Sequence, residues 1–252
     1  MTSSRNDGKP VLSLNKVSKS FGGVVAAKNI DLDFFGGEIL GLIGPNGAGK
    51  TTLVNLITGI YAVDSGAITF KGRDVTRKPT YQRARMGIAR TFQHPRLLAR
   101  CSLYDNIMLG ADLARKAGRE TTRDVRAEMA DLLSLCGMAD ARLDGMISQL
   151  PYGQQKLLEI IRAILSEPDV LLLDEPAAGL NSSETGYIVS LMDVAVKQGI
   201  AVLLIEHSMD LVMSVCDRLT VLNFGHQIAN GTPAEIRENQ AVITAYLGSA
   251  KL

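Results

Sequence analysis

The sequence predicts an α/β fold with a parallel sheet, an N-terminal antiparallel β-subdomain and an inserted helical subdomain. Residues 11–40 contain short apolar and polar runs interrupted by Gly22-Gly23 and Gly36-Gly37, a pattern typical of antiparallel strands and hairpins. Residues 95–165 change to mostly helical periodicity. The continuous apolar runs EILGLIG, DVLLLDE and IAVLLIEH are typical of parallel strands that are covered on both faces.

Shorter patterns place individual elements within this plan. KTTLVNLITG predicts a helix that ends near Gly59, with an apolar face formed by Leu53, Leu56, Ile57 and Ile60. RLTVLNFGHQIANGTP predicts a hairpin. We expect residues 1–10 to form a flexible polar tail and residues 11–252 to form one domain, with the helical subdomain inserted at about 95–165.

Composition excludes several classes of protein. The formal charge of +1 argues against a broad nucleic-acid surface, so we expect no nucleic-acid partner. No apolar run reaches the roughly 18 to 20 residues that span a bilayer, and the polar N-terminus lacks the apolar region of a signal peptide. The widely spaced Cys101, Cys136 and Cys216 are predicted to be buried, reduced thiols of a cytosolic protein.

The turn GPNGAGKT matches the pattern G-x-x-x-x-G-K-[ST] and lies between a predicted strand and a predicted helix. That context identifies a phosphate-binding P-loop, whose glycines let successive N–H groups point at phosphate oxygens. Lys50 can supply positive charge to the β- and γ-phosphates, and the Thr51 hydroxyl can ligate Mg²⁺. The predicted nucleotide-binding residues here are Gly44, Pro45, Asn46, Gly47, Ala48, Gly49, Lys50, Thr51 and Thr52.

Two adjacent acids follow the apolar run VLLL. Asp174 can hold a water bound to Mg²⁺, and Glu175 can act on an attacking water as general base, a role worth about 10²–10⁴ in rate. A nucleotide kinase has less need of the second acid, because its acceptor is not water. The alternative is a strand end that carries two solvated acids.

His207 ends another apolar run, AVLLIEH. A lone histidine in that position is often only a polar stop. If this strand lies beside the one that ends in Asp174, however, His207 is directed at the same phosphates. We therefore predict that His207 joins Glu175 and Lys50 as a catalytic residue.

Several motifs together resemble one family. GPNGAGKTT, TFQ at residues 91–93, LPYGQQ, LLLDEP and EH occur in the order of an ATP-binding subunit of an ABC transporter, and the similarity extends from Val11 over nearly the whole chain. IARTFQHPRLL, PYGQQ and DEPAAGLN most resemble the cassettes of branched-chain amino-acid importers. The resemblance implies an ATPase that uses ATP and Mg²⁺ to drive transport.

The resemblance also implies roles for single residues. Gln93 would ligate Mg²⁺ through its amide oxygen, together with Thr51 and, through water, Asp174. Phe21 looks like the aromatic residue that stacks on adenine, a contact worth about 1–3 kcal/mol by analogy with base stacking. A core phenylalanine is the alternative reading of Phe21.

In this family two cassettes meet head to tail, and the signature turn of one completes the nucleotide site of the other. By resemblance, Tyr152, Gly153, Gln154 and Asn181 would act in trans, with unpaired N–H groups at a helix N-terminus facing the γ-phosphate. The common signature has serine at Pro151 and glycine at Tyr152. Proline offers neither a hydroxyl nor an N–H, so one polar contact is expected to be missing or replaced. Asn181 stands where many cassettes carry aspartate.

The resemblance further implies partners and a location. A groove near residues 93–108 would receive a helix of a transmembrane permease subunit, and a periplasmic binding protein would take part only indirectly. The second cassette could be this same chain or a related one, and branched-chain importers generally pair two different cassettes. The expected location is peripheral, on the cytoplasmic face of the bacterial inner membrane.

Other functions stay open from the sequence. A urea importer or a lipopolysaccharide exporter would use a similar cassette, because the transported molecule never touches it. A soluble ABC ATPase acting on DNA or the ribosome is disfavoured, because the chain shows no second cassette, long coiled-coil insertion or zinc hook.

Overall fold

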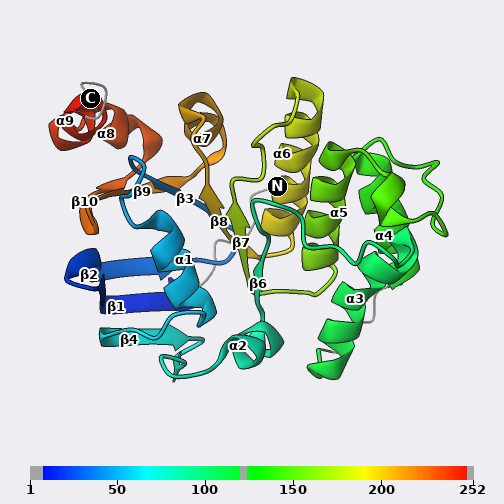
Figure 1. Cartoon of the computed structure of the whole chain (residues 1–252), viewed down its shortest axis with the longest axis horizontal. Helices are drawn as coiled ribbons and strands as arrows, with labels where there is room; N and C mark the ends of the chain where they lie inside the picture. Colours follow the sequence, from blue (N-terminus) through cyan, green and yellow to red (C-terminus); the bar gives the residue numbers. More distant parts are fainter. Residues whose placement is uncertain (1–7, 120–123, 249–252) are drawn as a thin grey trace.

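Two β-sheets organise the computed structural model, which describes residues 8–119 and 124–248 (Figure 1). The first sheet has the strand order β2-β1-β4-β5, and its neighbours are all antiparallel. The second has the order β10-β9-β3-β8-β7-β6 and is parallel except for β10. The strands are β1 Leu12–Phe21, β2 Val24–Phe34, β3 Ile39–Ile43, β4 Ser65–Phe70, β5 Arg73–Asp74, β6 Ile88–Arg90, β7 Val170–Asp174, β8 Ala201–Ile205, β9 Arg218–Asn223 and β10 His226–Gly231.

Helices connect and cover these strands. They are α1 Lys50–Thr58, α2 Thr80–Met86, α3 Leu103–Lys116, α4 Val125–Leu135, the short 3-10 helix η1 Ile147–Gln149, α5 Tyr152–Ile164, α6 Ser182–Lys197, α7 Met209–Val215, α8 Pro233–Glu238 and α9 Gln240–Gly248. Residues 1–7 of the predicted polar tail lie outside the described residues.

The predicted hairpins and parallel strands are confirmed. Gly22 and Gly23, both with positive φ, join β1 to β2, and Phe224-Gly225 joins β9 to β10. All residues of β3, β7 and β8 are buried, as their continuous apolar runs predict. The sequence therefore identified the fold class correctly.

The second sheet is covered on both faces. Successive side chains of a strand point to opposite faces, so each buried strand contributes to two separate cores. On β7, Val170 and Leu172 pack in a core shared with the first sheet and α1. Leu171 and Leu173 pack instead in a core shared with α3, α5 and α6. In Figure 1 the first sheet and α1 lie on one side of β6 to β8, and α5 and α6 lie on the other.

Helices α3, α4 and α5 occupy the region predicted to be helical, and α3 packs along α5. Their starts are locally encoded: the Ser102 side chain accepts a hydrogen bond from the Asp105 N–H, and Asp124 caps α4 in the same way. The bounds of a helical subdomain at 95–165 stay a prediction. No helix within residues 8–119 and 124–248 is long and apolar enough to cross a bilayer.

Two burial predictions were wrong. Ile60 is 47% exposed, because α1 ends at Thr58 and the left-handed Gly59 turns the chain away before Ile60 can join the apolar face. Cys101 is only half-buried, because it precedes α3 in an irregular segment, whereas Cys136 and Cys216 are buried as expected.

Candidate functional site

The P-loop connects β3 to α1 and is packed tightly against two other parts of the backbone. A Cβ atom on Gly44 would lie 2.1 Å from the carbonyl oxygen of Leu222, and one on Gly49 would lie 2.2 Å from that of Ala26. Both residues also have positive φ. These two positions therefore require glycine for space as well as for conformation.

Lys50 lies at the start of α1 with its side chain curled into the loop. Its Nζ donates hydrogen bonds to the carbonyl oxygens of Gly44 at 2.6 Å and Pro45 at 3.1 Å. Burial lowers the pKa of the Lys50 ammonium, while Glu175 and Asp174 act in the opposite direction. The cation thus sits where a helix N-terminus and P-loop amides favour an anion.

A cavity of about 250 Å³ is lined by the P-loop, by the start of β2, and by Glu175 and His207, which follow β7 and β8. Its lining comprises Val24, Val25, Ala26, Asn46, Gly47, Ala48, Gly49, Lys50, Thr51, Thr52, Glu175 and His207. Phe21 is not part of this lining. Phe21 is 42% exposed, so it is not a core phenylalanine. Its ring meets that of Tyr61 edge-on, with the ring centroids 5.1 Å apart.

Asp174 and Glu175 have different partners. Asp174 is the last residue of β7 and Glu175 follows it, so their side chains point in different directions. An Asp174 carboxylate oxygen forms an ion pair with Arg90 at 2.8 Å, and Arg90 also donates to the Asn55 side chain at 2.6 Å. Glu175 has a positive φ of 49°, which is uncommon for a residue with a side chain. Its carboxylate is therefore presented by a strained backbone position.

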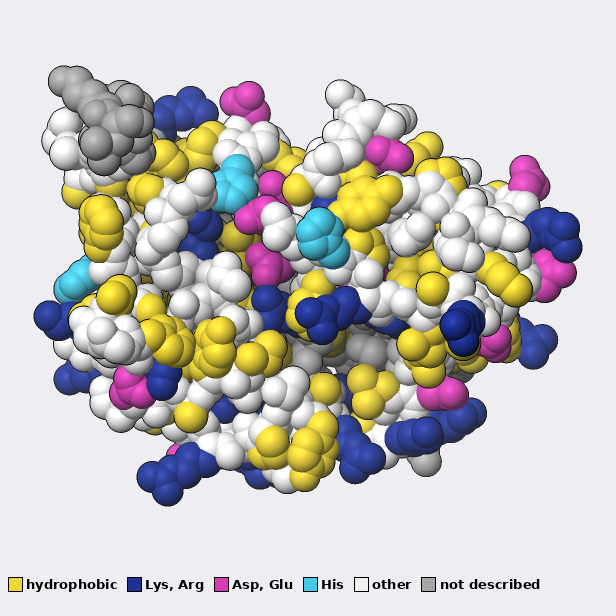
Figure 2. Space-filling model, in the orientation of Figure 1, with side chains coloured by type: hydrophobic (Ala, Val, Ile, Leu, Met, Phe, Trp, Pro, Cys, Tyr) yellow, Lys and Arg dark blue, Asp and Glu magenta, His cyan; other side chains and the backbone are white. Residues whose placement is uncertain are grey.

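Gln93 and His207 both bind the Glu175 carboxylate. Gln93 Nε2 donates to Oε2 at 2.8 Å, and His207 Nε2 lies 2.8 Å from Oε1. His207 reaches this position because β8 pairs with β7, with Ile205 beside Asp174. The structure thus brings Glu175 and His207, two predicted catalytic residues, together with Gln93, a predicted Mg²⁺ ligand. Figure 2 shows acidic and histidine side chains gathered over the middle of this face, close to lysine and arginine side chains.

The signature turn at the start of α5 makes contacts within its own chain. The Tyr152 hydroxyl donates to the backbone carbonyl of Gln93 at 3.1 Å. A Cβ on Gly153 would lie 2.0 Å from a carboxylate oxygen of Glu184 on α6, so a larger residue here would have to displace that carboxylate. Asn181 caps α6 by accepting from the Glu184 N–H at 2.9 Å. In Figure 1, strands β6 to β8 separate α5 from α1 and its P-loop.

A family model described as ABC transporter matches residues 27–178, and one described as branched-chain amino acid ATP-binding cassette transporter matches residues 226–251. The chain belongs to the ABC transporter family of ATP-binding cassettes. It is accordingly an ATP-binding ATPase subunit.

Curated relatives resemble the cassette over almost their full length. The LivG protein of Salmonella typhimurium, named a high-affinity branched-chain amino acid transport ATP-binding protein, is 41% identical over 96% of this chain and 99% of its own. The BraF protein of Pseudomonas aeruginosa, with the same description, is 37% identical over the same shares.

Among solved structures, an ATP-binding cassette of an ABC transporter in its ADP conformation has a TM-score of 0.81 and 28% identity, and covers 95% of this chain and 99% of its own. A nucleotide-free cassette has a TM-score of 0.80 and 28% identity, and covers 94% of this chain and 99% of its own.

Four charged residues that bind the loops or the strand ends around the site were not predicted from the sequence. Arg90 pairs with Asp174, as described above. On α5, Lys156 donates to backbone carbonyls of the loop after β7, and Glu159 accepts from the N–H groups of Phe92 at 3.2 Å and Arg96 at 2.9 Å. At the end of β8, Glu206 accepts from the Ala177 N–H at 2.6 Å. Glu159 lies inside the apolar run LLEII and Glu206 directly follows the run AVLLI, whereas Arg90 and Lys156 each have a polar neighbour and gave no such signal.

Burial shifts the pKa of three of these groups. It lowers the pKa of Lys156, with Glu206, Glu175 and Glu159 opposing the effect. It raises the pKa of Glu159 and of Glu206, although backbone N–H donors favour the charged form of both.

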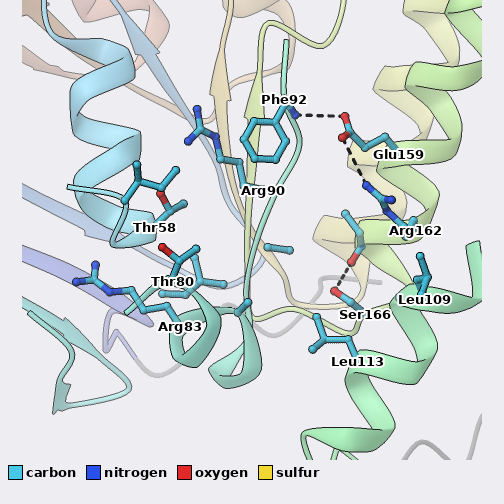
Figure 3. Close-up of a pocket in the computed structure, with 16 residues that line it drawn as sticks. Thr58, Thr80, Arg83, Arg90, Phe92, Leu109, Leu113, Glu159, Arg162 and Ser166 are labelled. Carbon is cyan, nitrogen blue, oxygen red and sulfur yellow. Dashed lines mark hydrogen bonds and ion pairs between the residues drawn. The ribbon is translucent and has the colours of Figure 1, made fainter. Parts of the chain in front are cut away.

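An apolar cavity of about 340 Å³ lies between α2, α3 and α5, beside the segment predicted to form the groove (Figure 3). Its lining meets that segment only at its borders, Phe92 and Leu109, and includes none of residues 93–108. The groove predicted near residues 93–108 stays a prediction. In and next to that segment, Glu159 accepts from the N–H groups of Phe92 and Arg96, and the Asn106 side chain binds the backbone of Leu98.

Proposed function

We propose that this cassette is the energy-coupling subunit of an importer for branched-chain or other hydrophobic amino acids, working with Mg²⁺ and ATP. The observation that carries the proposal is the grouping of Lys50, Glu175 and His207 around one cavity with the P-loop. The substrate class rests on the similarity to LivG and BraF proteins.

The donor set of this site fits Mg²⁺. Thr51 offers a hydroxyl oxygen, Gln93 an amide oxygen and Asp174 a carboxylate oxygen, and Mg²⁺ prefers few protein oxygens together with several waters. When bound, the ion would neutralise negative charge on the phosphates. The Arg90 ion pair fixes the direction of the Asp174 carboxylate, so this side chain enters the site already oriented.

Hydrolysis follows from the placement of Glu175. Its carboxylate would accept a proton from the attacking water, while His207 and Gln93 hold its two oxygens in place. Lys50 would exchange the carbonyls of Gly44 and Pro45 for the phosphates, where its charge stabilises the transition state. The N–H groups of residues 46–52 would bind the remaining phosphate oxygens.

The nucleotide site is completed in trans by the signature turn of a second cassette. The separation of α5 from α1 supports this, because the turn of the same chain lies on the other side of the sheet. Tyr152, Gly153, Gln154 and Asn181 would face the γ-phosphate of the partner. The second cassette is either this same chain or a related one.

The groove near residues 93–108 is the proposed seat of a helix from the permease subunit, and the cavity between α2, α3 and α5 lies beside it. The segment that contains Gln93 borders this cavity at Phe92, so loss of the γ-phosphate could reach the permease through it. In this proposal the cassette is peripheral on the cytoplasmic face of the bacterial inner membrane, and a periplasmic binding protein acts on it only indirectly, through the permease.

The solution mass of Glu175→Gln with Mg²⁺ and either ATP or ADP tests the catalytic and trans assignments together. Removing the base should trap a closed dimer with ATP and leave a monomer with ADP. Glu238→Gln, an exposed acid on α8, is the matched control and should stay monomeric after turnover. A monomer in both nucleotides, with ATP still bound, would exclude pairing of this chain with itself and point to a related cassette.

The substrate class needs a separate test in the source cell. A Lys50→Ala replacement should abolish uptake of radiolabelled leucine and leave uptake of an unrelated solute unchanged. Unaltered leucine uptake would overturn the substrate assignment without touching the ATPase assignment.

A further inference from the structure

The loop after β7 is held on one side by a buried lysine. Lys156, 3% exposed on α5, donates from Nζ to the carbonyl oxygens of Glu175 at 3.0 Å, Pro176 at 3.1 Å and Ala178 at 2.8 Å. All three donors of the ammonium group are thereby matched to backbone acceptors of one loop. The Lys156 ammonium group thus holds three backbone carbonyls of this loop around one positive charge.

The same loop is held on the other side by a buried glutamate. Glu206, 6% exposed at the end of β8, accepts from the Ala177 N–H at 2.6 Å and from the His207 N–H at 3.2 Å. One carboxylate thus binds both the loop after β7 and the backbone of the histidine that contacts Glu175.

Lys156 and Glu206 act on the two ends of a single peptide group. The carbonyl of Pro176 and the N–H of Ala177 belong to the same peptide unit, and in a trans peptide they point in opposite directions. The positive charge binds the negative end of this peptide dipole, and the negative charge binds its positive end. The orientation of the Pro176–Ala177 peptide is therefore fixed by two opposite charges.

This peptide lies one residue beyond Glu175, whose φ is 49°. A side-chain-bearing residue keeps such a conformation only where its surroundings hold it there. The Lys156 bond to the Glu175 carbonyl and the fixed peptide that follows supply that constraint. A backbone rotation at this point would swing the Glu175 carboxylate away from Gln93 and His207.

We propose that Lys156 and Glu206 are positioning residues that hold the Glu175 carboxylate at the attacking water. The inference rests on the proposed function, because it concerns the same hydrolysis. Lys156 lies one helical turn after Tyr152, so the residue that fixes the Glu175 loop is carried by the helix that begins with the signature turn. A partner's nucleotide that binds the signature turn would act on this loop through α5.

The test compares steady-state ATP hydrolysis of Lys156→Met, Lys156→Arg and the control Lys197→Met, whose lysine is exposed at the end of α6. Methionine retains most of the length without donors, so kcat should fall about 10- to 100-fold while KM for ATP changes little, because the P-loop is untouched. Lys156→Arg should recover part of the loss, and Lys197→Met should match the wild type.

A second comparison separates positioning from a merely structural role. In a Glu175→Gln background, Lys156→Met should cause no further fall in kcat, because the group that it positions has been removed. Losses that multiply in the double variant would overturn the inference. So would an unchanged kcat in Lys156→Met.

Two further outcomes are distinguishable. If neither this chain alone nor its complex with a related cassette hydrolyses ATP, the proposed function fails and not only the inference. If Lys156→Met does not fold, Glu206→Gln replaces it, because its amide oxygen can still accept from Ala177 while the charge is lost. That variant should also lower kcat with little change in KM, and wild-type kinetics would overturn the inference.

Discussion

Arg90 and Asp174 form an ion pair of 2.8 Å at the edge of the sheet where β6 and β7 end. Both side chains are about nine-tenths buried, and Arg90 is held in turn by Asn55 on α1. Charge-assisted bonds in such surroundings are strong and directional. Asp174, the proposed metal-binding acid, is thus oriented by a residue that contacts neither nucleotide nor metal in the proposed mechanism.

Replacing Arg90 should therefore weaken the response to Mg²⁺. We expect Arg90→Met to raise the Mg²⁺ concentration for half-maximal ATP hydrolysis, or to lower the rate, by about 10- to 100-fold. The measurement is a Mg²⁺ titration of the ATPase rate. Arg85→Met, at an exposed position of α2, is the control, and equal titration curves for both variants would contradict the assignment.

The P-loop glycines should differ in their tolerance of alanine. A Cβ on Gly44 would strike the Leu222 carbonyl, whereas one on Gly47 meets nothing within 4 Å and is opposed only by a positive φ. Gly47→Ala should cost about 1–2 kcal/mol, and Gly44→Ala should cost more and lose nucleotide affinity. Thermal melting and titration with a fluorescent ATP analogue test this order, and the reverse order would refute it.

Arg83 should be a main contributor to stability. It is 1% exposed, and its guanidinium donates to the carbonyls of Leu56 and Ile57 at 2.7 Å, Thr76 at 2.8 Å and Lys78 at 2.9 Å. Arg83→Met would leave these buried acceptors without their donor. The free energy of unfolding in urea should fall by about 3 kcal/mol or more. Arg85→Met should change it by less than about 0.5 kcal/mol, and a similar small change in Arg83→Met would be inconsistent with this role.

The cysteines should differ in their reaction with a thiol reagent. Burial raises the pKa of both Cys136 and Cys216 to about 12, so at pH 8 only about one in ten thousand of these thiols is a thiolate. Labelling with iodoacetamide, followed by peptide mass spectrometry, should modify the half-buried Cys101 first. Cys136 and Cys216 should react readily only after unfolding in urea, and rapid labelling of either in the native protein would contradict their burial.

The sequence predicted the fold class and most of the candidate site because both depend on short contiguous patterns. The strands β3, β7 and β8 are continuous apolar runs, and the P-loop is a single turn of fixed spacing. Even the meeting of His207 with Glu175 followed from an expected pairing of two strands. The role of Gln93 in Mg²⁺ binding and the trans roles of the signature turn stay predictions.

The sequence by itself thus determined which residues offer phosphate-binding amides, a cation and two acids, because local periodicity and spacing encode them. Only the tertiary structure decided what holds them in place. Arg90, Lys156 and Glu206 are buried or nearly buried charged residues. Apart from the adjacent His207, their partners lie 19 to 84 positions away, and Lys156 and Glu206 bind backbone groups rather than side chains. Every residue carries such backbone groups, so no pattern of side chains could reveal which peptide each charge would bind.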